Sequence, residues 1–403
     1  MDTTALFAQL EAIEQRAIVV AADPVKETFT EAYVARTERL KTIVREGTCI
    51  FREETEKILA GIFREIIQAN NLDVRPLILL SRSPRVNAAS YGDGVFVINV
   101  GLLEALDSYE ELAFVMAHEL AHDQLFHLRD RLEDRAAHAA AMADHRNRRT
   151  RRRRVRKEGA GGIMADLRET VYEQHRHGRS NELEADSLAL QYLRNTDISV
   201  SAAVQSLDHL EQTDHFSLPA PAVNKLLNTT TYPFRERWVK EATSMFGGSF
   251  GKKAVADSTD FWQQDSLTTH PALPLRRSLL ATMLTEYSLA GGDTAGRPHG
   301  FTDLAHRESV RSYLDAGMNA HALVLALKWL DVASDDYYYA LAADALLQTH
   351  QAIGRHDFDR VIPPSRFFAN PGANAVVRML QQMRTDELKK LTMALLTEKL
   401  AAY

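Results

Sequence analysis

One segment constrains the fold of this chain most strongly: the apolar stretch at residues 112–128, which contains His118-Glu119-Leu120-Ala121-His122. Ser108 and Glu111 just before it have the spacing of a capping box, which predicts that a helix begins there. On that helix the two histidines lie on one face, about one turn apart. Burying them without partners costs several kcal/mol as an order of magnitude, so a shared metal ion is indicated. The alternative, a hydrogen-bonded pair of core histidines, stays open at this point.

A catalytic zinc ion needs three protein ligands and one open position for water, so a further donor must come from elsewhere in the chain. Residues 181–186, Asn-Glu-Leu-Glu-Ala-Asp, open a second predicted helix and set Glu182 and Asp186 four residues apart on one face. Two like charges at that spacing repel each other, and a cation or a neighbouring histidine would relieve the repulsion. An ordinary solvated acidic face is the alternative interpretation.

An HExxH helix followed by an ExxAD helix resembles the gluzincin metallopeptidases, the family that includes HtpX, the CAAX prenyl protease, Oma and BepA. The resemblance implies that Glu182 is the third ligand of one Zn²⁺ per chain and that Asp186 supports a ligand histidine. Glu184 is then a surface or structural residue. It also implies a zinc-dependent metalloendopeptidase that hydrolyses polypeptide substrates in protein quality control or processing.

On this interpretation Glu119 has the catalytic role. Beside His118 and His122, its carboxylate accepts a proton from the attacking water and passes that proton to the departing amine. A zinc-stabilised chaperone or scaffold that binds client proteins without turnover is the alternative function. Glu119 argues against it, because a structural zinc needs a closed shell of four ligands, and the only cysteine, Cys49, excludes a thiolate-rich site.

Two further segments resemble the family. Asn-Ala-Ala at 87–89 and VFVINVGLL at 95–103 are similar to its substrate-binding edge strand, for which Val95, Val97 and Asn99 are the candidate residues. Thr-His-Pro at 269–271, followed by Arg276, is similar to a segment whose histidine can approach the zinc and hold the enzyme latent. His270 and Arg276 are therefore candidates for a fourth ligand or an oxyanion donor. An incidental surface histidine is the alternative for His270.

The remaining pattern predicts a mainly α protein of the α+β class. Apolar periodicity predicts helices over 4–20, 25–45 and 51–70, while two β-rich runs at 76–80 and 95–100, the second preceded by a Gly-Asp-Gly turn, predict a small antiparallel sheet. Residues 1–300 are expected to form the zinc protease domain. Residues 301–403 are expected to form an α-helical, weakly tetratricopeptide-like region, a candidate docking site for a protein partner.

Charge and hydropathy limit the other functions. The 403-residue chain has a net charge of −6, which gives the whole molecule no attraction for nucleic acid or anionic lipid. The segment Arg146–Lys157, with eight arginines and one lysine, is predicted to belong to an exposed, mobile Arg/Gly-rich insertion at 146–162, and contact with a polyanion through it stays an alternative role. We find no membrane-spanning window and no secretory leader, which predicts a soluble protein, cytoplasmic as the sequence stands and periplasmic if a leader was omitted.

Overall fold

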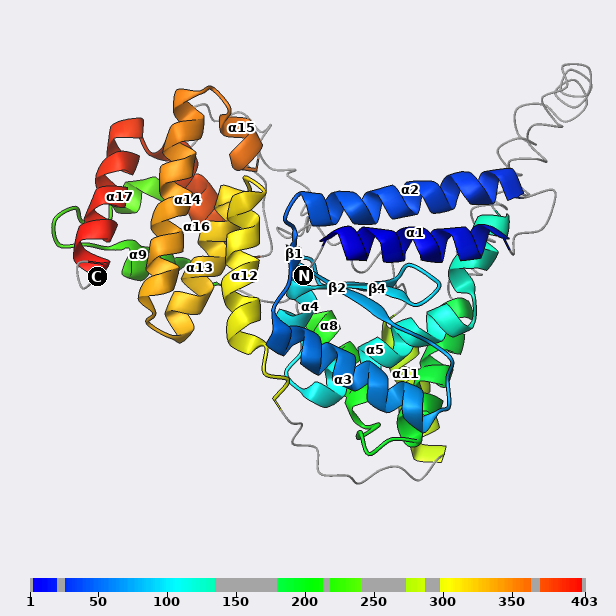
Figure 1. Ribbon diagram of the computed structural model, residues 1–403. Helices are drawn as coiled ribbons and strands as arrows, with labels where there is room; N and C mark the ends of the chain where they lie inside the picture. The colour runs from blue at the N-terminus through cyan, green and yellow to red at the C-terminus, as the bar shows by residue number, and fades with distance from the viewer. Residues whose placement is uncertain are drawn as a thin grey trace, which may run out of the picture. The chain divides into compact units, whose positions relative to one another are not determined.

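The computed structural model describes residues 3–19, 26–134, 180–212, 218–240, 273–286, 298–363 and 370–400. The chain divides into two compact units (Figure 1). The first unit comprises Met1–Arg82, Val86–Asp208 and Ser266–Gly300, and the second comprises Ser83–Arg85, His209–Asp265 and Phe301–Tyr403. One limit of the units lies between Gly300 and Phe301. Residues 218–240, which we assigned to the protease domain, pack instead with the C-terminal helices.

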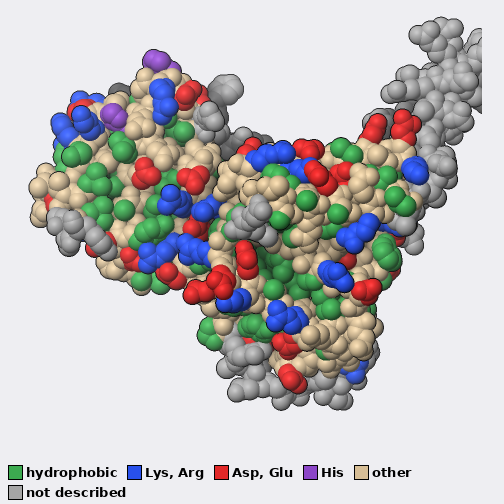
Figure 2. Space-filling model, in the orientation of Figure 1, with side chains coloured by type: hydrophobic (Ala, Val, Ile, Leu, Met, Phe, Trp, Pro, Cys, Tyr) green, Lys and Arg blue, Asp and Glu red, His purple; other side chains and the backbone are tan. Residues whose placement is uncertain are grey.

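Three helices open the first unit, as the apolar periodicity predicts: α1 (Thr3–Val19), α2 (Lys26–Arg45) and α3 (Glu53–Ala69). The apolar stripe of α1, formed by Leu6, Leu10 and Ile13, packs with residues of α2 against one face of the sheet. The outer surface of α2 has acidic and basic side chains side by side rather than a patch of one sign (Figure 2). The α1–α2 pair is therefore an amphipathic layer that covers the sheet.

The sheet has four strands in the order β1 (Cys49–Ile50), β2 (Leu77–Ser81), β4 (Val95–Asn99) and β3 (Ala88–Ser90). The predicted Gly-Asp-Gly turn is present and forms a hairpin, since β3 and β4 pair antiparallel across a turn in which Gly92, Asp93 and Gly94 all have positive φ. The sheet as a whole is mixed, which corrects the antiparallel prediction. The chain reverses direction twice between β2 and β4, so these two neighbours run parallel.

Strand β4 lies inside the sheet, between β2 and β3. Val95 and Val97 face the layer of α1 and α2, while the ring of Phe96 lies 4.6 Å from that of Phe63 on α3, on the other side. Burial on both faces explains why the strand sequence is continuously apolar. The prediction that Val95, Val97 and Asn99 form an edge strand is therefore wrong, because both sides of their backbone already pair within the sheet. In the described part of the chain, the edge strands of this sheet are β1 and β3.

A short helix, α4 (Val100–Ala105), connects the sheet to α5 (Tyr109–Gln124). Helix α5 begins as predicted, because the Ser108 side chain accepts a hydrogen bond from the backbone N–H of Glu111, while the Glu111 carboxylate accepts one from the N–H of Asp107. Residues 110–123 of this helix are all buried. A helix that is enclosed on every side has no solvent face, and this explains why its apolar residues surround the polar motif completely.

The described secondary structure of the second unit is helical, and this confirms the helical prediction for the described residues of 301–403. A single core of Leu, Val, Ala and aromatic side chains connects its helices. Its elements are α9 (Ala220–Leu227), η2 (Glu236–Trp238), α12 (Thr302–Asp315), α13 (Asn319–Val332), α14 (Asp336–Gly354), α15 (Phe358–Val361), α16 (Pro371–Gln382) and α17 (Thr385–Lys399). Helix α9 belongs here because its apolar face packs on α13 and α16.

Two predicted features lie outside the described residues: the Arg/Gly-rich insertion at 146–162 and His270. No helix in the described part of the chain is both long and apolar enough to cross a membrane.

Candidate metal centre

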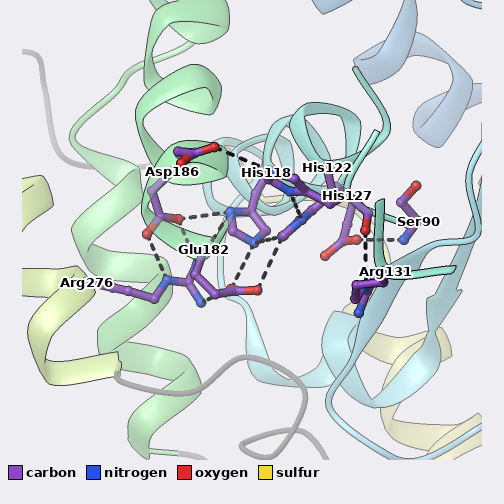
Figure 3. A network of polar contacts seen from close by, with 10 residues as sticks. Ser90, His118, His122, His127, Arg131, Glu182, Asp186 and Arg276 are labelled. Atoms are coloured by element: carbon purple, nitrogen blue, oxygen red, sulfur yellow. Dashed lines mark hydrogen bonds and ion pairs between the residues drawn. The ribbon is translucent and has the colours of Figure 1, made fainter. Parts of the chain in front are cut away.

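Helix α5 supplies three buried polar side chains, His118, Glu119 and His122. The rings of the two histidines project from the same helix toward Glu182 (Figure 3), and their Nε2 atoms lie 3.0 Å apart. Glu182 is on a second helix that is described over residues 180–194. The structure thus brings together the side chains that the HExxH and ExxAD patterns indicate.

The three donors have the spacing of a metal site. Glu182 Oε2 lies 3.4 Å from His118 Nε2, and Glu182 Oε1 lies 3.4 Å from His122 Nε2. Donors that bind one tetrahedral zinc ion at 2.0–2.1 Å are separated from each other by roughly 3.3 Å. The His118, His122 and Glu182 group is the cluster of buried donors that meets the geometry of a metal site among the described residues. This donor set fits a single divalent cation and is compatible with zinc.

Asp186 fixes the tautomer of His118. Its Oδ1 lies 2.9 Å from His118 Nδ1, so Nδ1 carries the proton that the carboxylate accepts. In the neutral ring, Nε2 is then the unprotonated nitrogen, and it faces His122 and Glu182 (Figure 3). A carboxylate that orients a metal-binding histidine in this way raises its basicity and holds its ring in place.

Arg276 on α11 (Leu273–Glu286) is buried and contacts both carboxylates of the ligand helix. Its Nε and Nη2 donate to the two oxygens of Asp186 at 2.8 and 2.7 Å, and its Nη1 lies 3.1 Å from Glu182 Oε2. The guanidinium relieves the repulsion between Glu182 and Asp186 that the i, i+4 spacing creates. These contacts favour a positioning role for Arg276 over the predicted oxyanion role.

The two histidines differ in their affinity for protons in the metal-free protein. Burial and the Arg276 charge lower the pKa of His118, but its hydrogen bonds to Asp186 and Glu182 outweigh them and raise that pKa to about 9. Burial lowers the pKa of His122 to about 4. At neutral pH His122 is therefore neutral and ready to bind a cation, whereas His118 must first release a proton.

The Glu119 carboxylate contacts the sheet. Its Oε2 accepts a 2.6 Å hydrogen bond from the backbone N–H of Ser90, the last residue of β3. Asn87 and Tyr91, the residues on either side of β3, form backbone hydrogen bonds with Asn99 and Val95. The alternation of an antiparallel ladder therefore turns the backbone groups of Ala88 and Ser90 toward the opposite edge. The edge strand and the Glu119 carboxylate are thus direct neighbours.

His127 was missed by the sequence analysis. Its Nδ1 lies 2.8 Å from His122 Nδ1, and its Nε2 lies 3.7 Å from the carboxylate of Glu184. Glu184, which we predicted to be a surface or structural residue, is exposed, and its carboxylate contacts His127. A histidine five residues after His122 gives no signal at helical spacing, so the i, i+4 rule could not identify it.

Two imidazoles and one carboxylate face a common point, and these are the metal donors of His₂Glu metallopeptidases. A second glutamate, Glu119, lies beside an edge strand. Residues 53–283 match peptidase family M48, and the chain belongs to this family of metallopeptidases. It is also 28% identical over 160 residues to a protein of Vibrio cholerae named "Putative beta-barrel assembly-enhancing protease". That alignment covers 39% of this chain and 33% of the relative, so the chain matches about a third of the relative's length.

Proposed function

We propose that the protein is a zinc-dependent metalloendopeptidase in which His118, His122 and Glu182 bind the metal. One observation carries the proposal: three buried side chains from two helices direct their donor atoms to one point, with the two histidine Nε2 atoms 3.0 Å apart and each of them 3.4 Å from one oxygen of Glu182. The chain offers no thiolate to this group, since its one cysteine, Cys49, lies in β1. Bound zinc would supply a Lewis acid that polarises the scissile carbonyl and lowers the pKa of the attacking water toward neutrality.

Glu119 transfers the proton. Its carboxylate is buried, on the helix that carries both histidines, and it accepts the proton of the attacking water and delivers it to the departing amine. The N–H of Ser90 holds the carboxylate in place in the resting protein. Asp186 orients His118. Arg276 forms ion pairs with both Asp186 and Glu182, and these ion pairs hold the two carboxylates in position beside the histidines.

The polypeptide substrate adds as a further strand to the edge of β3, in place of the β4 strand expected from the sequence. Two observations support this: Ala88 and Ser90 direct their backbone groups to that edge, and Ser90 touches Glu119. Strand addition uses main-chain hydrogen bonds, so it would accept many sequences. A role in protein quality control or processing follows from the family resemblance and stays a prediction, as does a latent state held by His270.

The test compares casein cleavage by the wild type and Glu119→Gln after both are loaded to the same zinc content. Gln keeps the size and the hydrogen bond to Ser90 but cannot accept the proton, so we expect a loss of about 10²–10⁴-fold in turnover with zinc retained. Equal cleavage by both proteins would remove Glu119 from the mechanism. Absence of cleavage in both, with zinc bound and His270→Ala also inactive, would favour the scaffold function.

A further inference from the structure

The polypeptide makes a sharp turn immediately after the metal helix. Helix α5 ends at Gln124, and a new helical segment begins at His127 and is described to residue 134. Between them Phe126 has φ of 55°, the left-handed conformation that usually requires glycine, and its side chain is 61% exposed. An exposed phenylalanine in this conformation gains little from packing, so something else must favour the turn.

The turn brings His127 to His122. On an uninterrupted helix, residues five apart point about 140° away from each other and their rings do not meet. Here the Nδ1 atoms of the two rings are 2.8 Å apart and the ring centroids are 4.9 Å apart. The left-handed residue at 126 redirects the chain and makes this contact geometrically attainable.

The protons on the two rings can be assigned. When Nε2 of His122, which faces His118 and Glu182, binds the metal, the ring proton is on Nδ1 and is donated to Nδ1 of His127. His127 then carries its own proton on Nε2, which faces Glu184 Oε2 at 3.7 Å. Glu184 is two residues beyond Glu182 on the same helix, so His127 connects the two helices that supply the metal donors.

We propose that His127 is a positioning residue for the metal ligand His122, and that the left-handed turn at Phe126 exists to place it. The proposal rests on the proposed function, because it requires His122 to bind the metal. It assigns to His122 the support that Asp186 provides for His118, with an imidazole in place of a carboxylate.

The experiment measures zinc affinity by chelator competition and the d–d absorption bands of the cobalt-substituted protein. For His127→Ala we expect about 10–100-fold weaker zinc binding and altered cobalt bands. His127→Asn, whose amide oxygen can accept the His122 Nδ1–H, restores both to near the wild type. His299→Ala is the matched control, because His299 is a buried histidine of the same unit that bonds the Leu106 carbonyl, and we expect it to leave both readouts unchanged.

A second pair of variants tests the turn. Phe126→Gly and Phe126→Val both remove the ring, but glycine adopts positive φ freely and a β-branched residue does not. We expect wild-type zinc affinity for the glycine variant and weaker binding for the valine variant. Wild-type affinity and cobalt bands in both His127→Ala and Phe126→Val would overturn the proposal while leaving the zinc site intact. A wild type that binds no zinc would overturn the proposed function itself.

Discussion

Replacing Asp186 by asparagine removes one charge from the centre without changing its shape. In the wild type, Asp186 Oδ1 accepts from His118 and from Arg276 Nη2, and Oδ2 accepts from Arg276 Nε. Asparagine has one acceptor oxygen, which can serve His118, so its amide N–H groups then face the Nε–H of Arg276. The variant therefore leaves a buried guanidinium with Glu182 as its remaining ion-pair partner.

The cost follows from burial. Both side chains of the Asp186–Arg276 pair are at most 5% exposed, and breaking a buried pair of this kind costs about 3–5 kcal/mol. Coulomb's law gives a similar figure, about 4 kcal/mol at a 4 Å separation and an effective dielectric of 20. Because Glu182 stays near Arg276, we expect a loss of about 3 kcal/mol in the metal-free protein and a zinc affinity about tenfold weaker.

Hydrogen exchange of the α5 amides is the appropriate assay, because it reports the opening free energy of the first unit even if the second unfolds separately. The matched control is Asp208→Asn, which removes a carboxylate from Arg277, the next residue on α11, at a partly exposed ion pair with a 2.7 Å separation. That loss should be about 0–1 kcal/mol. Equal effects of the two substitutions would refute the positioning role assigned to Asp186 and Arg276.

Three further predictions follow from the site. Zinc binding at pH 7 should release about one proton, that of His118, so the apparent zinc affinity should rise with pH and level off near the His118 pKa of about 9. Calorimetry in buffers of different ionisation enthalpy measures the number of protons released. A pH-independent zinc affinity would contradict this prediction. Binding of a peptide substrate to Glu119→Gln should slow hydrogen exchange of the Ala88 amide. The amides of β4 already pair within the sheet, so their exchange should not change. Slower exchange in β4 alone would contradict strand addition at β3. His270→Ala should raise casein cleavage if His270 holds the enzyme latent, and unchanged cleavage would remove that role.

The sequence predicted the parts of the site that depend on local spacing. His118 and His122 are one helical turn apart, Glu182 and Asp186 share a second helix, and the capping residues located the beginning of α5. These features need no knowledge of tertiary structure, because the period of a helix alone determines which side chains share a face.

The errors concern contacts between distant segments. The apolar pattern of Val95 and Val97 is the same for an edge strand and an interior one, and the order of strands in a sheet is not encoded in either strand. Arg276 was recognised, but its pairing with Asp186, 90 residues away, depends on how α11 packs. His127 depends on a left-handed turn at a phenylalanine, where no glycine marks the position.

The most direct measurement of the central claim is the zinc content of purified protein after dialysis against a weak chelator, for the wild type and Glu182→Ala. The two donors of α5 remain in the variant, so any difference reports the carboxylate of the second helix. We predict one zinc ion per wild-type chain and substantially less than one in the variant. A full equivalent of zinc in Glu182→Ala would contradict the proposal that His118, His122 and Glu182 together bind the metal.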